Sequence, residues 1–348
     1  MKTLTLFLFL LAALGTAEGA KYIDISQIQG SDHRFKFEGD EATTDGVVTR
    51  VYKDGFIIQS KQPDASSETS DALYIYQKDT VVKIGNELRV TGVVEEYVPG
   101  GEGSYNLSLT QIRAETVKRI RSRTTLPKPI VINYLLPSFP KIIKQPGSDF
   151  DPKKNALDFW ESMEHMRVTV LNATVVGPNS SYGEIAVGVP QAKPEPATIR
   201  GGVKLTGYTS NPTKILISLD SNNPNHYSVG ERINGAIHGT VNYSFGNYKI
   251  GSSKSIAPPV TTRLPRTSKI PSIPVTALKL ATFNVENLYT GLPDKKFETI
   301  ADIIIHSLKT PGILALQEIH DNSGPENNRV LDATETLTKL VKFRGCPS

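Results

Sequence analysis

The segment from Leu278 to Asn322 most constrains the fold, because its pattern predicts a strand, a helix and a second strand in succession. The apolar run from Leu278 to Phe283 predicts the first strand, and Ile313 to Leu316 predicts the second. Between them, Asp294 can cap a helix whose apolar residues are three or four positions apart. Strands joined by a crossover helix form a right-handed unit, so these two should be parallel, with their carboxyl ends at one edge of the sheet.

Two polar residues lie just beyond these predicted strands. Asn284 directly follows the first strand, and Glu318 lies shortly after the second. Ligands in open α/β sheets bind outside the carboxyl ends of the strands, so an amide and a carboxylate would be presented together. Hard oxygen ligands with room for water and phosphate suit Mg²⁺ or Ca²⁺ better than a soft metal. We therefore predict a divalent-metal site at Asn284 and Glu318.

The chain resembles the opening of the endonuclease/exonuclease/phosphatase superfamily, which has the deoxyribonuclease I-like fold. The resemblance rests on two motifs, Thr-Phe-Asn-Val-Glu-Asn at 282–287 and Leu-Ala-Leu-Gln-Glu at 314–318. In that family the Asn of the first motif and the Glu of the second help to hold the catalytic metal. The resemblance therefore implies that Asn284 and Glu318 hold Mg²⁺, Mn²⁺ or Ca²⁺ for the hydrolysis of nucleic-acid phosphodiester bonds.

The family supplies its other catalytic groups from later loops, as a His paired with an Asp, an Asp-x-Asn segment and a closing Asp-His pair. After Glu318 this sequence contains one His, His320, which we interpret as an exposed loop residue, and none of those segments. The amphipathic run from Arg329 to Phe343 predicts one more helix. We therefore expect a chain that is truncated within its catalytic domain and is inactive or incomplete as an enzyme.

The N-terminus has the pattern of a secretory signal peptide. Residues 1–19 contain one Lys, an apolar run from Leu4 to Leu14 and small residues near the end. The apolar run is too short to span a bilayer, and no later segment reaches about 18 uncharged apolar residues. The single cysteine, Cys346, excludes an internal disulfide and a structural zinc site. We expect a secreted, extracellular protein without a membrane span, stabilised by apolar cores.

Residues 21–116 are predicted to form an all-β module. Lys53-Asp54-Gly55 separates two β-rich runs and is a hairpin signal. With three further runs at 72–77, 87–98 and 104–111, the module has five strands, which suit a small closed barrel of the OB kind. The runs at 46–59 and 84–97 resemble the OB-fold modules found ahead of the nuclease domain in exported nucleases.

A second OB-like module is predicted at 151–250, where five more strand-like runs form a weak internal repeat of the first module. Segment 117–150 reads as a basic, Pro-rich linker and 251–277 as a Pro/Ser-rich linker. Residues 278–348 would be the N-terminal part of the endonuclease/exonuclease/phosphatase domain. The expected fold class is therefore multidomain, with two all-β OB-like barrels followed by a partial α/β domain of the deoxyribonuclease I-like sandwich type.

OB-like barrels bind single strands by stacking bases on exposed aromatic rings, although aromatic residues in strands also pack in cores. The candidate nucleic-acid-binding residues are Phe56, Tyr74, Tyr76, Tyr243 and Tyr248. Asparagines that begin N-x-Ser/Thr triplets are possible glycosylation sites; these are Asn106, Asn172, Asn179 and Asn242. Two alternatives to a secreted nuclease remain open. One is a non-catalytic secreted OB-fold protein that binds nucleic acid or another polymer, and the other is a phosphatase acting on a small phosphoester.

Overall fold

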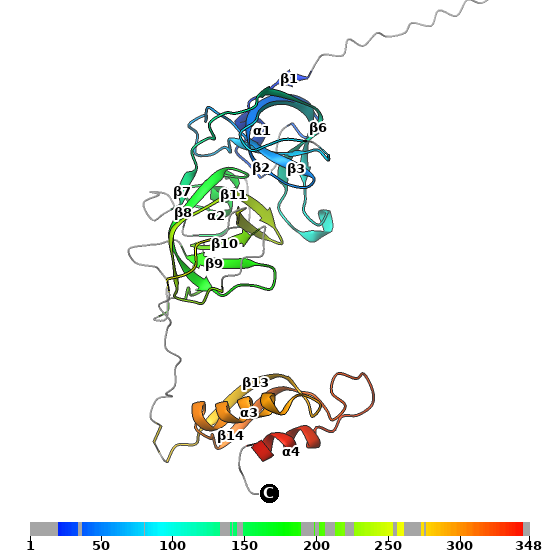
Figure 1. Ribbon diagram of the computed structural model, residues 1–348, viewed down its shortest axis with the longest axis vertical. Helices are drawn as coiled ribbons and strands as arrows, with labels where there is room; N and C mark the ends of the chain where they lie inside the picture. Colours follow the sequence, from blue (N-terminus) through cyan, green and yellow to red (C-terminus); the bar gives the residue numbers. More distant parts are fainter. Residues whose placement is uncertain are drawn as a thin grey trace, which may run out of the picture. The chain divides into compact units, whose positions relative to one another are not determined.

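The computed structural model describes residues 20–33, 37–79, 81–132, 140, 142–144, 149–188, 198, 202–205, 213–219, 226–252, 256–260, 273–274 and 276–343. The chain divides into two compact units, Met1–Leu264 and Pro265–Ser348, whose elements are labelled in Figure 1. The predicted signal peptide and Cys346 lie outside the described residues. Within these ranges, no helix combines the length and the apolar character needed to cross a membrane.

The first sheet of the N-terminal unit contains six strands that close on themselves. The strands are β1 (Lys21–Tyr22), β2 (Glu41–Val51), β3 (Gly55–Gln59), β4 (Ala72–Tyr76), β5 (Glu87–Tyr97) and β6 (Leu109–Arg121). Their order is β1-β2-β3-β4-β6-β5, and β2 also pairs with β5. The β2–β3 turn lies at the predicted hairpin, where Tyr52 N donates to Gly55 O at 2.8 Å. Helix α1 (Ile25–Gln29) adds Ile25 and Ile28 to the apolar interior of this sheet.

The second sheet also contains six strands and closes on itself in the same way. Its strands are β7 (Ile130–Ile132), β8 (Arg167–Gly177), β9 (Glu184–Gly188), β10 (Lys214–Leu219), β11 (Arg232–Ser244) and β12 (Asn247–Ser252). Their order is β11-β12-β10-β9-β8-β7, with an added β11–β8 pairing. Helix α2 (Ala156–Glu161) begins at Asn155, whose side chain accepts from Leu157 N, and it buries Phe159 and Trp160. These large side chains are part of the core on which the second sheet closes.

The expected fold class, two OB-like barrels followed by a partial α/β sandwich, is wrong. The described chain is nearly all-β, with two sheets stacked in succession and few helices. One apolar core joins the sheets, because Ile57, Ala72 and Leu109 of the first belong to the same cluster as the interior of the second. The sequence periodicity locates strands but carries no information about this shared core, which is why the expectation of separate barrels failed.

The C-terminal unit is small. Strands β13 (Leu280–Leu288) and β14 (Ile313–Ile319) are its one sheet among the described residues, and they are parallel, as predicted. Helix α3 (Asp294–Asp302) continues into the π-helical turn η2 (Ile303–Ser307), and α4 (Thr334–Phe343) follows. Phe297, Ile300 and Leu340 of these helices pack with Val285 and Leu288 of β13. A two-stranded sheet with helices is not the two-sheet sandwich that we expected.

The opposite face of this small sheet is open. Leu280 is 68% exposed and Ile313, its partner across the strands, is 53% exposed. In the N-terminal unit, β6 continues to Arg121 and β7 lies within segment 117–150, which we had interpreted as a linker. Strand β7 pairs with β8 in a parallel register from Ile130 to Ile132. Part of that Pro-rich segment is therefore a structural edge of the second sheet.

Candidate functional site

The structure brings Asn284 and Glu318 together at the edge of the β13–β14 sheet. The register between the strands is regular up to Asn284, which lies opposite Gln317, and it shifts beyond that pair. Asn284 Nδ2 donates a hydrogen bond of 2.6 Å to Glu318 Oε1. Both side chains are exposed. The amide and the carboxylate that the βαβ pattern predicted at one edge are therefore in hydrogen-bond contact, and their binding of a metal stays a prediction.

The backbone is unusual at this edge. Glu286, Asn287 and Glu318 have φ angles of 58°, 55° and 58°, a left-handed conformation that costs roughly 1–2 kcal/mol for a residue with a Cβ. Strand alternation alone would direct Glu318 toward the same side as Leu314 and Leu316, which pack on the core. The left-handed turn instead leaves its carboxylate exposed and within reach of Asn284. Strain of this kind clusters at functional sites.

The hydrogen bonds around Asn284 make it a positioning residue for Glu318. Its Oδ1 accepts from Glu286 N at 2.8 Å, while its Nδ2 holds one oxygen of Glu318. The amide is thereby fixed at both ends, and the second oxygen of Glu318 faces solvent-exposed space. A ligand oriented by a neighbouring hydrogen bond is the usual arrangement at metal sites.

A groove next to this pair combines cationic and aromatic side chains. It is lined by Tyr289, Lys295, Lys296 and His320, together with Glu286. Lys296 Nζ lies 2.5 Å from Glu286 Oε2, and its hydrogen bond and charge lower the pKa of that carboxyl. The groove also meets the first turn of α3, whose partly unpaired N–H groups favour an anion. The groove thus places two lysines, each paired with a carboxylate, beside the helix N-terminus.

His320 differs from our interpretation of it as an exposed loop residue. Its ring is half-buried, is stacked against Tyr289 with centroids 6.2 Å apart, and has Nε2 3.0 Å from Asn287 Oδ1. Its Nδ1 is buried without a hydrogen-bond partner among the described residues. Both partners come from the end of β13, so no pattern close to His320 in the sequence could reveal them.

The residues present fit one class of metal. No group of three or more His, Cys, Asp or Glu side chains that could hold a metal occurs in the described part of the chain, which leaves one carboxylate and one amide. Mg²⁺ is commonly bound by one or two carboxylates, with water and substrate phosphate completing its shell. Zinc sites need three or four protein ligands. Glu318 with Asn284 therefore fits Mg²⁺ or Mn²⁺ and does not fit a structural zinc.

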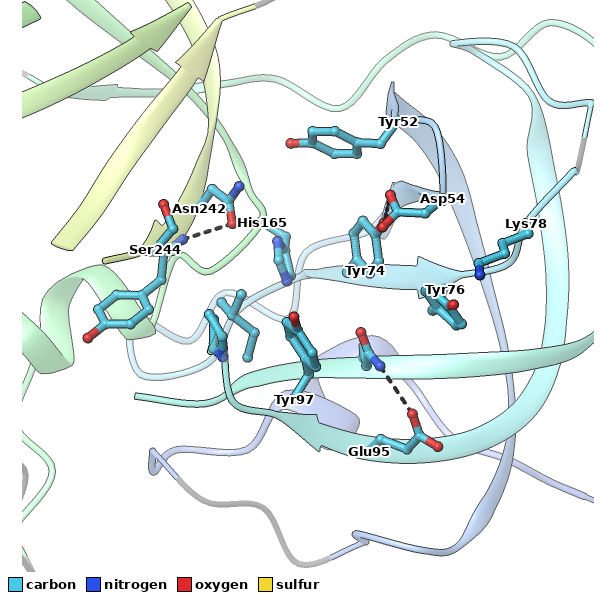
Figure 2. A pocket seen from close by; sticks show the side chains of 14 residues that line it. Tyr52, Asp54, Tyr74, Tyr76, Lys78, Glu95, Tyr97, His165, Asn242 and Ser244 are labelled. Carbon is cyan, nitrogen blue, oxygen red and sulfur yellow. Dashed lines mark hydrogen bonds between the residues drawn. The ribbon is translucent and has the colours of Figure 1, made fainter. Parts of the chain in front are cut away.

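The predicted aromatic residues are divided between a pocket and the cores. Tyr74, Tyr76 and Tyr243 line one pocket of the N-terminal unit, and Figure 2 shows Tyr74 and Tyr76 on its wall. Phe56 is 1% exposed in the first core and Tyr248 is 9% exposed in the second. Those two rings cannot stack on a base without unfolding their sheet.

The four candidate glycosylation asparagines differ in accessibility. Asn172 is exposed, and its Oδ1 accepts from Gly235 N at 3.1 Å. Asn106 donates through Nδ2, the nitrogen that a glycan would occupy, to Pro99 O at 2.6 Å. Asn179 and Asn242 are half-buried and accept from the backbone N–H groups of Tyr227 and Tyr243. Modification of these residues remains a prediction, and Asn172 is the best placed.

Comparisons with known proteins identify no family for the whole chain. Residues 120–262 match a family model described as a domain of unknown function, DUF8508. No curated protein matches the sequence. A solved structure of the hypothetical protein YgiW from E. coli has 13% identity and a TM-score of 0.17, covering 24% of this chain and 77% of its own. A deletion mutant of the single-stranded DNA-binding protein from Thermus aquaticus has 12% identity and a TM-score of 0.17. That match covers 65% of this chain and 97% of the other chain. At these TM-scores the two neighbours do not define the fold.

Proposed function

We propose that the C-terminal unit contributes a metal-dependent site of the endonuclease/exonuclease/phosphatase kind, which acts on phosphodiester bonds of nucleic acid. The observation that carries the proposal is the 2.6 Å hydrogen bond between Asn284 and Glu318 at the edge where two parallel strands end. When bound there, Mg²⁺ would polarise a phosphate oxygen and lower the pKa of a bound water.

Each residue has a separate task in this proposal. Glu318 would bind the cation through its free oxygen, and Asn284 would hold the carboxylate in one orientation. The groove beside them, with Lys295, Lys296 and the start of α3, would receive the phosphate. His320 lies on the wall of that groove, where its stacking on Tyr289 and its contact with Asn287 would fix the shape of the wall beside the phosphate.

Metal binding tests the proposal without requiring turnover. The full chain would be titrated with Mn²⁺ and monitored by electron paramagnetic resonance, with Glu318→Gln as the test variant. Glu298→Gln is the matched control, because Glu298 is an exposed helix residue paired with Lys295 and lies outside the edge. We expect Glu318→Gln to abolish binding and Asn284→Ala to weaken it by about tenfold or more, with no change for Glu298→Gln.

Hydrolysis is the second readout. Single-stranded and double-stranded oligonucleotides and a small phosphomonoester would be incubated with the full chain and Mg²⁺. Cleavage of an oligonucleotide that disappears in Glu318→Gln supports the nuclease assignment, whereas release of phosphate from the monoester alone assigns a phosphatase. Mn²⁺ binding that is absent, or that is equally strong in Glu318→Gln, would overturn the proposed site.

A further inference from the structure

The N-terminal unit contains a pocket that the proposed metal site does not use. It has a cavity volume of about 720 Å³, within the range of roughly 300–1,000 Å³ typical of small-molecule sites. Figure 2 shows its walls, with Tyr52, Tyr74, Tyr76 and Tyr97 from the first sheet and His165 and Asn242 from the second part of the unit. We call it the tyrosine pocket.

The tyrosines are arranged by the sheet itself. Tyr74 and Tyr76 are two positions apart on β4 and therefore face the same side, and Tyr97 lies on β5 beside the same surface. The rings of Tyr52 and Tyr74 have centroids 5.8 Å apart. Gly55 makes room for this packing, because a Cβ there would come within 2.6 Å of the Tyr74 hydroxyl. The backbone of the first sheet therefore fixes the positions of these aromatic rings.

Two of these rings are available to a ligand. Tyr97 is 51% exposed and Tyr76 is half-buried, so each presents part of its ring to the cavity. Tyr74 is more constrained, because its hydroxyl donates to Asp54 Oδ1 at 2.9 Å and its ring lies 5.9 Å from that of His165. A flat or chair-shaped ring could lie on Tyr76 and Tyr97 while its edge reaches the deeper polar groups.

His165 is the deepest polar group of the pocket. It is 2% exposed, both of its ring nitrogens are buried, and the backbone of Thr110 lies close enough to act on its titration. Its Nε2 lies 3.4 Å from Glu164 Oε1. That oxygen accepts hydrogen bonds from Thr110 N and Gln29 Nε2. The φ of His165 is 61°, which places it in the left-handed region. His165 lines the pocket, but a ligand there would meet the carbon edge of the imidazole, because its nitrogens are buried.

The protonation state of His165 limits what that ligand can be. Burial lowers the pKa of His165 to about 3, so the imidazole is neutral at physiological pH. It offers no positive charge to a phosphate.

The other polar groups of the pocket also favour a neutral ligand over a phosphate. The lining contains one cation, Lys78, and two carboxylates, Asp54 and Glu95. Sites for single-stranded nucleic acid combine stacking rings with a positively charged groove, and this balance of charge lacks that groove. Gln111 and Asn242 add amide groups to the lining. Aromatic platforms surrounded by carboxylates and amides suit a neutral ring that carries several hydroxyl groups.

We propose that the tyrosine pocket binds a saccharide, with one pyranose ring on Tyr76 and Tyr97 and its hydroxyl groups hydrogen-bonded to the amides and carboxylates of the lining. This binding function belongs to the N-terminal unit and is independent of the proposed metal site.

Isothermal titration of the full chain tests the proposal. The probes are cello-, chito- and manno-oligosaccharides, with a short oligothymidylate as the nucleic-acid probe. Tyr76→Ala and Tyr97→Ala are the pocket variants, and Tyr182→Ala is the control, because Tyr182 is 87% exposed and lies outside the pocket. We expect at least one oligosaccharide to bind, and each pocket variant to raise its Kd about fivefold to tenfold while Tyr182→Ala leaves it unchanged.

The dependence of binding on salt concentration distinguishes a saccharide from a nucleic acid as the ligand. Saccharide binding should be the same at low and high ionic strength, whereas binding of a polyanion weakens steeply as salt is added. The proposal is overturned if none of the oligosaccharides binds in the millimolar range or tighter, or if binding is unaffected by both pocket variants. Salt-sensitive binding of oligothymidylate that depends on Tyr76 and Tyr97, without saccharide binding, would assign the pocket to nucleic acid instead.

Discussion

His33 shows how a single side chain connects the two sheets of the N-terminal unit. It precedes β2 in the chain, yet its Nε2 lies 2.8 Å from Asp158 Oδ1 and its Nδ1 3.1 Å from Glu161 Oε2. Both carboxylates belong to helix α2, and all three side chains are buried. Tyr248 also donates to Glu161. The ring therefore bridges two buried carboxylates. Although burial disfavours the charge of the ring, the hydrogen bonds and charges of these carboxylates raise the pKa of His33, and the single positive charge of the protonated ring offsets part of their mutual repulsion.

Removal of His33 should destabilise the N-terminal unit. In His33→Ala, Asp158 and Glu161 lose their counter-ion while remaining buried, and breaking a buried ion pair typically costs about 3–5 kcal/mol. Urea unfolding monitored by the fluorescence of Trp160, which adjoins this cluster in α2, measures the change. His226→Ala is the matched control, because His226 is exposed. Equal unfolding midpoints for the two variants would show that the ion pair contributes nothing.

The sequence predicted the pairing of Asn284 with Glu318 but not the contacts of His33. Asn284 and Glu318 could be paired because each lies next to a predicted strand of one βαβ unit, whose handedness is fixed by local sterics. His33 and Glu161 are 128 positions apart, and nothing near either residue indicates the other. His165 was equally hidden, since its neutral state comes from its burial rather than from a motif.

At the level of single elements, Gly92 fixes the path of β5. The β5–β6 register shifts between Thr91 and Gly92, and a Cβ on Gly92 would lie 2.2 Å from Arg113 O. Because the obstructing atom belongs to the backbone of β6, no side-chain rotation could relieve the contact. The strands approach this closely only where one of them carries a glycine.

Gly92→Ala should therefore destabilise the first sheet. Overpacking of a well-packed interior costs typically about 1–3 kcal/mol, and the backbone contact here places the expected loss at the upper end. Chemical denaturation followed by circular dichroism gives the free energy of unfolding. Gly103→Ala is the control, because a Cβ at that loop position meets nothing within 4 Å. A Gly92→Ala protein as stable as the control would contradict the close approach of β5 and β6.

The strand positions were largely predictable, whereas the arrangement of the sheets was not. Alternating apolar residues predicted strands within a few positions of β2 to β5 and β8 to β12. β1 and β7 are only two and three residues long, too short for an alternating pattern, and both pair in parallel with strands far along the chain. The expected fold class failed at this step, because the stacking through Ile57, Ala72 and Leu109 is a long-range property.

At the scale of the whole molecule, the raised carboxyl pKa values belong to groups of the N-terminal unit that burial desolvates, whereas carboxyls held by hydrogen bonds in both units, such as Glu87 and Asp321, have lowered ones. In the N-terminal unit, burial raises the pKa of Glu96 to about 7 and that of Asp71 to about 6. Burial also acts against the charge of His33, but the hydrogen bonds and charges of Glu161 and Asp158 outweigh it and raise its pKa. In the C-terminal unit, the hydrogen bonds of Ser323 and Thr334 lower the pKa values of Asp321 and Asp332.

These shifts predict opposite responses to pH. In the unfolded chain Glu96 is already ionised at about pH 6.5. In the folded unit Glu96 keeps its proton until about pH 7, so the folded state binds more protons. The raised pKa of His33 acts in the same direction: its stabilisation is complete below its unfolded value and is lost as pH rises through the folded one. The lowered pKa values of Asp321 and Asp332 contribute stability that is lost only in acid, as pH falls through the folded values.

Calorimetry of the full chain should therefore show two unfolding transitions, of which only one responds between pH 6.5 and pH 8. We expect the N-terminal transition to lose about 1–2 kcal/mol across this interval, or a few degrees in Tm, and the C-terminal transition to stay constant. Glu96→Gln removes one of these titrations and should reduce the response, while the raised pKa values of His33, Asp71 and Glu164 account for the remainder. Because raised carboxyl pKa values require the folded state to bind extra protons, an N-terminal transition that became more stable as pH rose would contradict the burial of Glu96 and the ion pairs of His33.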